Sequence, residues 1–482
     1  MRSPHARAAG LVAFALLVAL PAGAEVRLPS VLSDHMVLQR AAWVPVWGWA
    51  APNEAVSVRF GNQTLGTVAD SDGRWRLHLD LSQAPSTPGV LSVRGAGKEI
   101  VVKDVLVGEV WLASGQSNME KPFGEKKGQQ PTFGSEEALA GAEQPEIRLF
   151  KVAKHKAAQP GEDVSGAWVR STPAALISTQ FSAAAYSFGR RLKQELGTPV
   201  GLIDATWGGT RIESWTPPDL LGQLDLPPAV KDKPASLYNG MIAGLAPFRL
   251  KGALWCQGES NILHTDDGPA YTAKMEAMIR GWRRAFGQDL PFYYVQLAPH
   301  LYSVLRKDQG VGGPESLPRL REAQLDALRI PNTGMVVTTD LADDLRDIHP
   351  RDKQSVGLRL ANLALAESYE RPGIEPYGPT YRAIRFAGRQ AILGFDHAQG
   401  LAARDGKPLD WFEIAGSDGR YHPATATIRG SEVLVESPLV NEPTSVRFGW
   451  HEAATPNLVN GAGLPAVPFR SQHPIPSKPP SL

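Results

Sequence analysis

The sequence predicts an α/β protein whose mostly parallel central sheet lies between two smaller β domains. Three observations predict this class. Apolar strand-like segments alternate with amphipathic helical patterns over residues 105–372, which indicates right-handed βαβ units and a parallel sheet. Residues 25–104 and 373–473 instead carry short strand-like segments parted by turn residues. The length of 482 residues fits several domains of roughly 100–200 residues each.

Residues 1–24 are predicted to be a secretory signal peptide. Arg2 and Arg7 precede an apolar run over residues 8–20, Pro21 ends that run, and small residues at 22–24 provide a cleavage site after Ala24. The run is shorter than the ~20 apolar residues that span a bilayer. We therefore expect an exported protein without a membrane anchor, most simply in a bacterial periplasm.

Residues 25–104 are predicted to form a small β-sandwich-like domain. Segments 44–49 and 56–60 alternate with a period of two, as half-buried strands do. The Asp-Gly dipeptide within residues 71–74 favours a tight hairpin between the strand-like segments on either side. A similar turn at residues 417–421 lies within the β-sandwich-like domain expected over 373–473. Four prolines in residues 474–482 indicate a loose tail.

The central segment, residues 105–372, is predicted to be the catalytic domain. Residues 105–113 form a nearly continuous apolar run, which is typical of a strand covered on both faces. Residues 182–196 form an amphipathic helical pattern that opens on a capping serine and stops at Gly197. Further strands are expected over 200–206, 251–257, 292–298 and 334–339, and further helices over about 269–286, 317–328 and 350–368.

Charge and cysteine content exclude several classes of partner and site. Lys and Arg total 50 against 49 for Asp and Glu, which gives no net field toward nucleic acid or anionic lipid. The single Cys256 excludes an intrachain disulfide and a cysteine-based zinc site. His264, Asp266 and Asp267 are close in sequence, but a solvated loop is the simpler interpretation. We expect no metal, nucleic acid or membrane partner, and the oligomeric state is not indicated.

Four polar segments follow predicted strands, where the ligands of open α/β sheets bind. The first, residues 114–119, presents Ser117 in a tight turn whose N–H groups point the same way, as a nucleophile and half an oxyanion hole would. Met119 replaces the second glycine of a Gly-x-Ser-x-Gly elbow. The second segment contains Gly208 and Gly209, which allow a free N–H to face a ligand oxygen.

The third and fourth segments supply an amide and a base. Gln257 and Asn261 follow the third strand, and either amide could donate to an oxyanion. In the fourth segment Pro350 suits the first position of a helix, which places His349 at the cap beside Asp347. A histidine held near a carboxylate is the general base that a serine requires. Each segment alone is more often an ordinary turn, but their order at four strand ends favours a hydrolytic site.

Together these segments resemble the sialate O-acetylesterase family of carbohydrate esterases within the SGNH hydrolase superfamily. The resemblance covers nearly the whole mature chain. It lies in residues 114–120, 207–215, 255–261 and 347–353, together with 32–40, 412–416 and 463–470. It implies an SGNH-hydrolase-like three-layer α/β/α core and a serine-dependent carbohydrate O-acetylesterase that needs no cofactor. Ser117 would be the nucleophile and His349 its general base, and the N–H groups of Ser117 and Gly209 with the Gln257 amide would form the oxyanion hole.

Two departures from the superfamily pattern leave roles open. Arg346 stands where the superfamily usually has an aspartate three residues before the histidine, so Asp347 is the preferred orienting acid. Residues 258–261 read Gly-Glu-Ser-Asn in place of Gly-x-Asn-Asp, which leaves the amide donor open between Gln257 and Asn261. The alternatives to Asp347 are Asp340, Asp343, Asp344 or a Ser-His dyad.

The sequence leaves two acetylated substrates open. O-acetylated sialic acid would favour an arginine near the site, with Arg211 and Arg321 as candidates. Acetylated hemicellulose, such as xylan or xyloglucan, would favour exposed aromatic residues, with Trp207 and Trp215 as candidates. The remaining expected substrate contacts are Gln116, Asn118 and Glu259. The alternative function is a non-catalytic carbohydrate-binding protein on an esterase scaffold.

Overall fold

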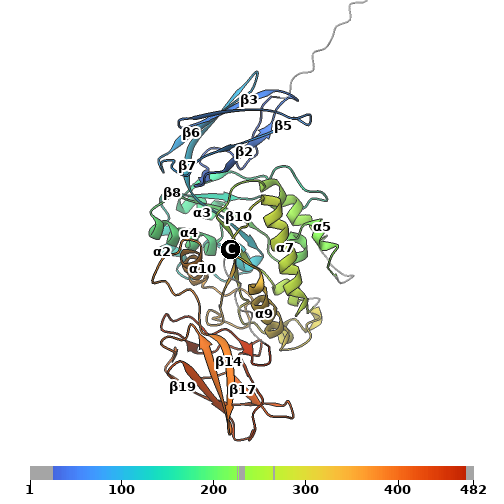
Figure 1. Cartoon of the computed structure of the whole chain (residues 1–482), viewed down its shortest axis with the longest axis vertical. Helices are drawn as coiled ribbons and strands as arrows, with labels where there is room; N and C mark the ends of the chain where they lie inside the picture. Colours follow the sequence, from blue (N-terminus) through green and yellow to red (C-terminus); the bar gives the residue numbers. More distant parts are fainter. Residues whose placement is uncertain (1–24, 225, 227–233, 264–265, 474–482) are drawn as a thin grey trace, which may run out of the picture.

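The structure is a computed structural model that describes residues 25–224, 226, 234–263 and 266–473. The expected signal peptide at 1–24 and tail at 474–482 lie outside the described residues. The molecule is elongated, with N-terminal strands at one end, an α/β middle and C-terminal strands at the other end (Figure 1).

The middle of the chain is built on a sheet with the strand order β13–β12–β11–β7–β10–β8–β9. Every neighbouring pair on this path is parallel except β8 with β9. The predicted α/β class with a mostly parallel core sheet is therefore observed, and the antiparallel edge was not foreseen. The strands are β7 (Glu99–Gly115), β8 (Gln144–Lys151), β9 (Trp168–Ser171), β10 (Val200–Thr206), β11 (Gly252–Cys256), β12 (Phe292–Val295) and β13 (Thr333–Val336).

Helices cover both faces of this sheet. Successive side chains of a strand point to opposite faces, so the apolar central strands contribute to a core on each side. Leu112, Ile203 and Trp255 pack in one core with α7 (Ala270–Phe286) and α9 (Ser316–Asp326). Trp111, Leu202 and Leu254 pack in a second core with α4 (Ala183–Leu196) and α10 (Lys353–Glu367). Figure 1 shows α4 and α10 together on one side and α7 with α9 on the other.

Local signals set the ends of two long helices. The Ser182 hydroxyl accepts from the Ala185 N–H at 3.1 Å, and α4 ends at Gly197 with φ +66°, as the sequence predicts. The helix expected from residue 350 instead begins at Lys353, because the Asp352 carboxylate accepts from the Ser355 N–H at 2.9 Å. The expectation that Pro350 opens the helix and His349 caps it is therefore wrong, since both lie in the preceding loop.

The remaining helical segments are short. Among the described residues, no helix is long and apolar enough to cross a membrane. These segments are α1 (Ser117–Glu120), α2 (Ser135–Ala140), α3 (Pro173–Ser178), η1 (Ile212–Trp215), α5 (Pro218–Leu221), η2 (Tyr238–Ile242), η3 (Ala243–Leu245), α6 (Glu259–Ile262), α8 (Tyr302–Leu305), η4 (Lys307–Gln309) and η5 (Ala327–Arg329).

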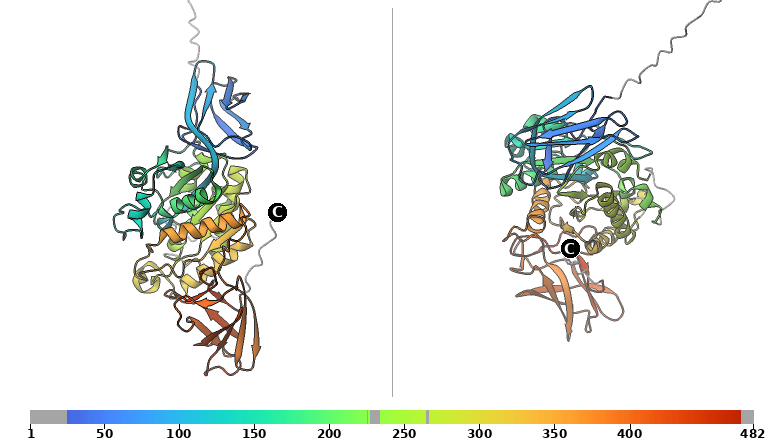
Figure 2. Two further views of the ribbon diagram at one scale, coloured as in Figure 1. Left: turned by 90° about the vertical axis from the view of Figure 1, so that its left-hand side faces the viewer. Right: turned by 45° about the horizontal axis from the view of Figure 1, so that its top comes forward.

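The 17-residue strand β7 runs from the N-terminal strands into the central sheet (Figure 2). Its first part pairs with β6 (Gly89–Arg94) and β1 (Val37–Gln39), and its last part pairs with β10 and β11. The expected boundary after residue 104 therefore falls inside one continuous strand. Through β7, the strands β3 (Ala55–Phe60) and β4 (Gln63–Val68) join the same 11-stranded sheet.

A second N-terminal sheet consists of β2 (Val44–Trp49) and β5 (Arg74–Leu79). The hairpin predicted at residues 71–74 is wrong, because β4 pairs with β3 whereas β5 pairs with β2. The turn thus passes from one sheet to the other. Strand propensity and turn chemistry were sufficient to locate the strands but not their partners, which lie far away in sequence.

The C-terminal strands form two four-stranded antiparallel sheets around one apolar core, with a small additional pair β16–β22. The turn at residues 417–421 does join a hairpin, β17 with β18. The first sheet has the order β14–β15–β20–β19 and the second β18–β17–β21–β23. Their bounds are β14 (Thr380–Ala387), β15 (Gln390–Asp396), β16 (Ala402–Ala403), β17 (Phe412–Ala415), β18 (Tyr421–Pro423), β19 (Thr425–Arg429), β20 (Glu432–Glu436), β21 (Ser445–Phe448), β22 (Leu458–Val459) and β23 (Phe469–Arg470).

Candidate functional site

The first three polar segments meet because their strands are parallel neighbours. In the β10–β7 and β11–β7 registers, Gly115 lies beside Thr206 on one side and Cys256 on the other. Each strand ends within one residue of this level, so the segments that follow leave the same edge of the sheet. This is the edge where ligands of open α/β sheets bind.

The turn that carries Ser117 is held against the third segment. Gly115 has φ +127°, and a Cβ there would lie 2.2 Å from the Cys256 carbonyl oxygen, so only glycine fits. The next N–H, of Gln116, donates to the same carbonyl at 3.0 Å. Ser117 then begins α1 and remains partly exposed.

The second segment passes directly against Ser117. The Gly208 N–H donates to the Glu120 carboxylate at 2.8 Å, and a Cβ at Gly208 would lie 3.2 Å from the Ser117 Cβ. Gly209 follows with φ +73° and is exposed. Within the described residues, the N–H groups of Ser117 and Gly209 have no protein acceptor. Two backbone donors are therefore available beside the serine, as an oxyanion hole requires.

His349 lies in the loop before α10 and is mostly buried, with 17% of its side chain exposed. Its Nδ1 is 3.5 Å from Oδ1 of Asp347, and the same oxygen accepts from the His349 N–H at 2.9 Å. Burial lowers the pKa of His349 to about 4; Asp347 opposes this effect, while Lys353 and Lys121 lower the pKa further. The imidazole is therefore neutral at pH 7, which is the protonation state of a general base.

The other candidate acids are held by arginines. Asp347 is the aspartate of this loop that faces the His349 ring. The carboxylates of the alternatives instead form ion pairs of 2.6–3.1 Å: Asp340 with Arg359, Asp343 with Arg351, and Asp344 with Arg346.

Asn118, the residue after Ser117, joins the first, third and fourth segments. Its Nδ2 donates to the Ile348 carbonyl at 3.0 Å and to the Glu259 carboxylate, and its Oδ1 accepts from Lys353 Nζ at 2.7 Å. Glu259 and Lys353 are buried while Ile348 is half-buried, and burial raises the pKa of Glu259. In this structure Asn118 and Glu259, both expected substrate contacts, connect the Ser117 turn to the loop that carries His349.

The two candidate amide donors lie beneath the serine turn. Gln257 is fully buried, and its Nε2 lies 3.1 Å from both Gln116 Oε1 and the Thr210 carbonyl and 2.7 Å from Asn261 Oδ1. The Asn261 Nδ2 donates to the Glu213 carboxylate at 3.0 Å and to Asp267. Both amides, together with the expected contact Gln116, therefore connect the polar segments to each other.

The two arginines expected near a sugar carboxylate are buried. Arg211 NH2 and Lys274 Nζ each lie 2.7 Å from the same oxygen of the Glu213 carboxylate, Oε1. Burial alone would raise the pKa of Glu213, but Arg211 and Lys274 lower it to about 2. Arg321 is 1% exposed, and its Nε donates to the Leu297 carbonyl at 2.8 Å. Neither guanidinium reaches the open surface.

Trp207 and a group of lysines do reach the surface beside Ser117. Trp207 is partly exposed, whereas Trp215 is fully buried against Trp255. Lys154 and Lys156 place Nζ 5.5 and 5.3 Å from the centroid of the Trp207 ring. Sequence analysis missed these lysines, although they follow the end of β8, because β8 was not predicted.

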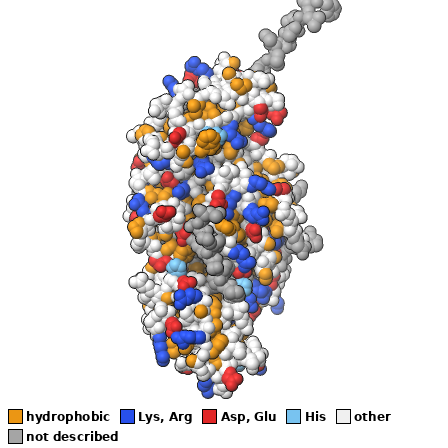
Figure 3. Space-filling model, viewed as in Figure 1, with side chains coloured by type: hydrophobic (Ala, Val, Ile, Leu, Met, Phe, Trp, Pro, Cys, Tyr) orange, Lys and Arg blue, Asp and Glu red, His pale blue; other side chains and the backbone are white. Residues whose placement is uncertain are grey.

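Glu120 offsets part of this positive charge. It pairs with Lys126 at 2.8 Å and with Lys154, and burial would raise its pKa but the two lysines lower it. Over the molecular face in Figure 3, basic and acidic side chains are interspersed, without a large field of one sign.

The structure gives no support to thiol or metal chemistry in the part that it describes. Cys256 is buried, and burial raises the pKa of its thiol. Asp266 pairs with Arg319 and Asp267 with Lys274, each at 2.7 Å, while His264 lies outside the described residues. No cluster of three or more His, Cys, Asp and Glu side chains among the described residues could hold a metal ion.

Comparison with known proteins places the chain in a family. The model of the family "Carbohydrate esterase, sialic acid-specific acetylesterase" matches residues 107–366, which is more than half of the chain. The human sialate O-acetylesterase is 32% identical over 93% of both chains, and that of Pongo abelii is 30% identical over the same shares. The crystal structure of a carbohydrate acetylesterase from Xanthomonas citri is 39% identical, with a TM-score of 0.84 over 92% of this chain and 99% of that one. This chain therefore belongs to the sialic acid-specific acetylesterase family of carbohydrate esterases.

Proposed function

We propose that this chain is a serine-dependent carbohydrate O-acetylesterase with an SGNH-hydrolase-type three-layer core. The observation that carries the proposal is the contact of Asn118 with the Ile348 carbonyl at 3.0 Å. It ties the residue after Ser117 to the residue before His349, although the two lie 230 positions apart in the chain. A serine in a glycine turn, two free N–H groups and a neutral histidine beside a carboxylate are the parts of an acyl-transfer site.

The reaction proceeds in two steps. The neutral His349 accepts the Ser117 proton while Ser117 Oγ attacks the acetyl carbonyl, and Asp347 orients the imidazole and stabilises its cation. The N–H groups of Ser117 and Gly209 hold the oxyanion, and each such donor contributes about 2.7–4 kcal/mol to the lowering of the barrier. The sugar alcohol leaves with the proton of His349. Water, deprotonated by His349, then releases acetate and restores Ser117.

Gln257 supports this site through its position. Its amide lies 3.1 Å from the Thr210 carbonyl, and Thr210 directly follows Gly209. It also contacts the side chain of Gln116, which precedes Ser117. Loss of this amide would therefore displace the two oxyanion donors relative to each other, whether or not the amide itself reaches the oxyanion.

The acetylated sugar is proposed to lie against Trp207. The partly exposed indole offers an apolar platform to a sugar ring, and Lys154 and Lys156 beside it offer a counter-charge to a sugar carboxylate. Lys156→Ala separates the two substrate classes. A rise in KM confined to O-acetylated sialic acids assigns an anionic sugar, whereas equal KM values on acetylated sialic acids and acetylated hemicellulose oligomers assign a neutral one.

Hydrolysis of p-nitrophenyl acetate tests the proposed function. Ser117→Ala and His349→Ala should each reduce kcat by about 10⁴-fold or more, since members of a catalytic triad act as a unit. Ser178→Ala in α3 and His397→Ala, directly after β15, provide matched controls, and both should keep full activity. An inactive wild type would favour the non-catalytic carbohydrate-binding alternative, and an active Ser117→Ala would exclude the serine mechanism.

A further inference from the structure

The outer face of the β2–β5 sheet carries indole and guanidinium groups in facing pairs. In the antiparallel register, Trp47 lies opposite Arg76 and Trp49 lies opposite Arg74. The neighbouring pair Val46 and Leu77 points to the other face and is buried in the N-terminal core, because side chains alternate along a strand. Two successive cross-strand pairs thus place two tryptophans and two arginines on one face. Trp47 is 7% exposed and packs against Phe248, whereas Trp49 is partly exposed and carries the Arg27 guanidinium on its ring.

The same face continues to an exposed aromatic stack. Pro45 lies opposite His78 in the register, and the ring of Trp43 stacks on His78 with 4.3 Å between centroids and 20° between planes. Trp43 is 64% exposed, and among the large hydrophobic residues that the structure describes only Val304 and Leu439 are more exposed. From Trp43 to Trp49 the strand extends about 20 Å, at roughly 3.3 Å per residue.

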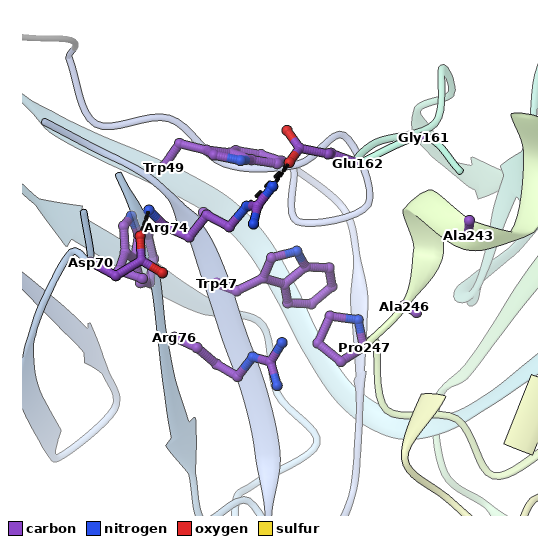
Figure 4. A pocket seen from close by; sticks show the side chains of 12 residues that line it. Trp47, Trp49, Asp70, Arg74, Arg76, Gly161, Glu162, Ala243, Ala246 and Pro247 are labelled. Carbon is purple, nitrogen blue, oxygen red and sulfur yellow. Dashed lines mark hydrogen bonds and ion pairs between the residues drawn. The ribbon is translucent and has the colours of Figure 1, made fainter. Parts of the chain in front are cut away.

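Segments of the α/β middle form the opposite wall and leave a cleft of about 580 Å³. Gly161, Glu162, Ala246 and Pro247 line this wall, and Trp47, Arg74 and Arg76 point toward it (Figure 4). Arg74 Nε donates to the Glu162 carboxylate at 3.1 Å across the cleft. The cleft is open to solvent, so a chain could enter and leave it.

Arg76 is available to bind a ligand in this cleft. Its side chain is exposed, and no ion pair or hydrogen bond to it occurs within the described residues, whereas Arg74 is bound to Glu162. The cleft is lined by Arg74 and Arg76 on the basic side and by Asp70 and Glu162 on the acidic side, so its charges cancel. Such a lining gives no electrostatic preference for an anion.

This combination matches the chemistry of a neutral sugar chain. The apolar C–H faces of pyranose rings pack on indole rings, and planar guanidinium and carboxylate groups exchange hydrogen bonds with neighbouring hydroxyls. The exposed Trp43 and the partly exposed Trp49 lie about 20 Å apart along the strand, a spacing that suits several consecutive sugar units better than one. We propose that the cleft between the β2–β5 sheet and residues 161–162 and 243–247 binds a neutral polysaccharide chain, at a site separate from Ser117.

Binding of deacetylated polysaccharide to the full-length wild-type chain tests this proposal without any catalytic step. Xyloglucan and arabinoxylan, both deacetylated, serve as neutral probes in affinity electrophoresis and titration calorimetry, and polygalacturonate serves as the anionic probe. We expect retention by at least one neutral polymer and none by polygalacturonate. Trp43→Ala/Arg76→Ala should raise the Kd for the retained polymer at least tenfold, because both side chains are exposed and their loss leaves the core intact.

The matched control is Phe386→Ala/Arg382→Ala, which removes an exposed aromatic ring and an exposed arginine from the C-terminal strand β14. It should bind as tightly as the wild type. Turnover of p-nitrophenyl acetate should be equal in all three proteins, because this small ester does not extend to the cleft. Failure of the wild type to retain either neutral polymer, an unchanged Kd in Trp43→Ala/Arg76→Ala, or preferential retention by polygalacturonate would each overturn the proposal while leaving the esterase proposal intact.

Discussion

Gly115 is the last residue of β7 and the point where the chain turns into the Ser117 segment. Alanine at this position meets two penalties. Its φ of +127° costs an L-residue of order 1–3 kcal/mol. The new Cβ would also lie 2.2 Å from the Cys256 carbonyl oxygen, whereas real Cβ atoms essentially never approach closer than 3.0 Å. Relief requires a movement of about 0.8 Å between the first and third segments.

A movement of this size displaces Ser117, the proposed nucleophile, from its proposed partners. Because a misplacement of about 1 Å can cost ~10²-fold in rate, we expect kcat/KM of Gly115→Ala on p-nitrophenyl acetate to fall by about that factor. The free energy of unfolding, measured with urea, should fall by at least the 1–3 kcal/mol of the backbone strain.

Gly108→Ala in the same strand is the control that separates stability from catalysis. Its Cβ would lie 2.0 Å from the Pro199 carbonyl oxygen, but its φ is not positive and it lies about 23 Å from Gly115 along the strand. It should lose stability and keep kcat/KM per folded molecule. Wild-type kcat/KM in Gly115→Ala, or an equal loss per folded molecule in Gly108→Ala, would refute the reasoning.

Four further predictions concern three buried groups. Because burial lowers the pKa of His349 to about 4 and its neutral form is the base, kcat/KM should rise with pH through about 4 and be fully developed by pH 6, and an acid limb near 6.5 would contradict this. The same lowered pKa means that the unfolded chain binds more protons between pH 4 and 6.5, so the urea-derived free energy of unfolding should fall as pH falls through that window. Lys353→Met removes the donor to Asn118 Oδ1 and should lower kcat by about tenfold with little change in KM, since this contact positions the loop that carries His349. The control Lys193→Met on α4 should change neither kcat nor KM. Cys256 should react with a thiol reagent only in urea, because burial raises the pKa of its thiol, and rapid labelling of the native protein would show that it is accessible.

Local signals made parts of the fold predictable from the sequence. Ser182 and Gly197 mark the ends of α4 because a cap hydroxyl and a left-handed glycine act within one turn. The sequence did not predict that β7 pairs with both the N-terminal strands and the central strands, since its partners β6 and β10 are about 10 and 100 residues distant. The turns at 71–74 and 417–421 show the same limit. They have similar sequences, but one connects two sheets and the other closes a hairpin.

For the candidate site, the positions of polar residues after predicted strands identified the four segments. They did not show how deeply each side chain is buried. Ser117, Gly209 and His349 lie at or near the surface of the sheet edge, as a chemical group at a strand end can. Arg211 looked equally suitable in sequence, yet Glu213 and Asp267 hold it in a buried ion cluster. Burial depends on packing partners far along the chain, and no local pattern carries that information.

The role of Ser117 as the acetyl carrier is the central claim, and covalent trapping tests it most directly. An active-site-directed fluorophosphonate, reacted with the native protein and mapped by peptide mass spectrometry, should label Ser117 stoichiometrically and abolish hydrolysis of p-nitrophenyl acetate in parallel. Labelling should be much slower in His349→Ala, which lacks the base. Stoichiometric inactivation with the label on another residue, or full activity after Ser117 is labelled, would contradict the claim.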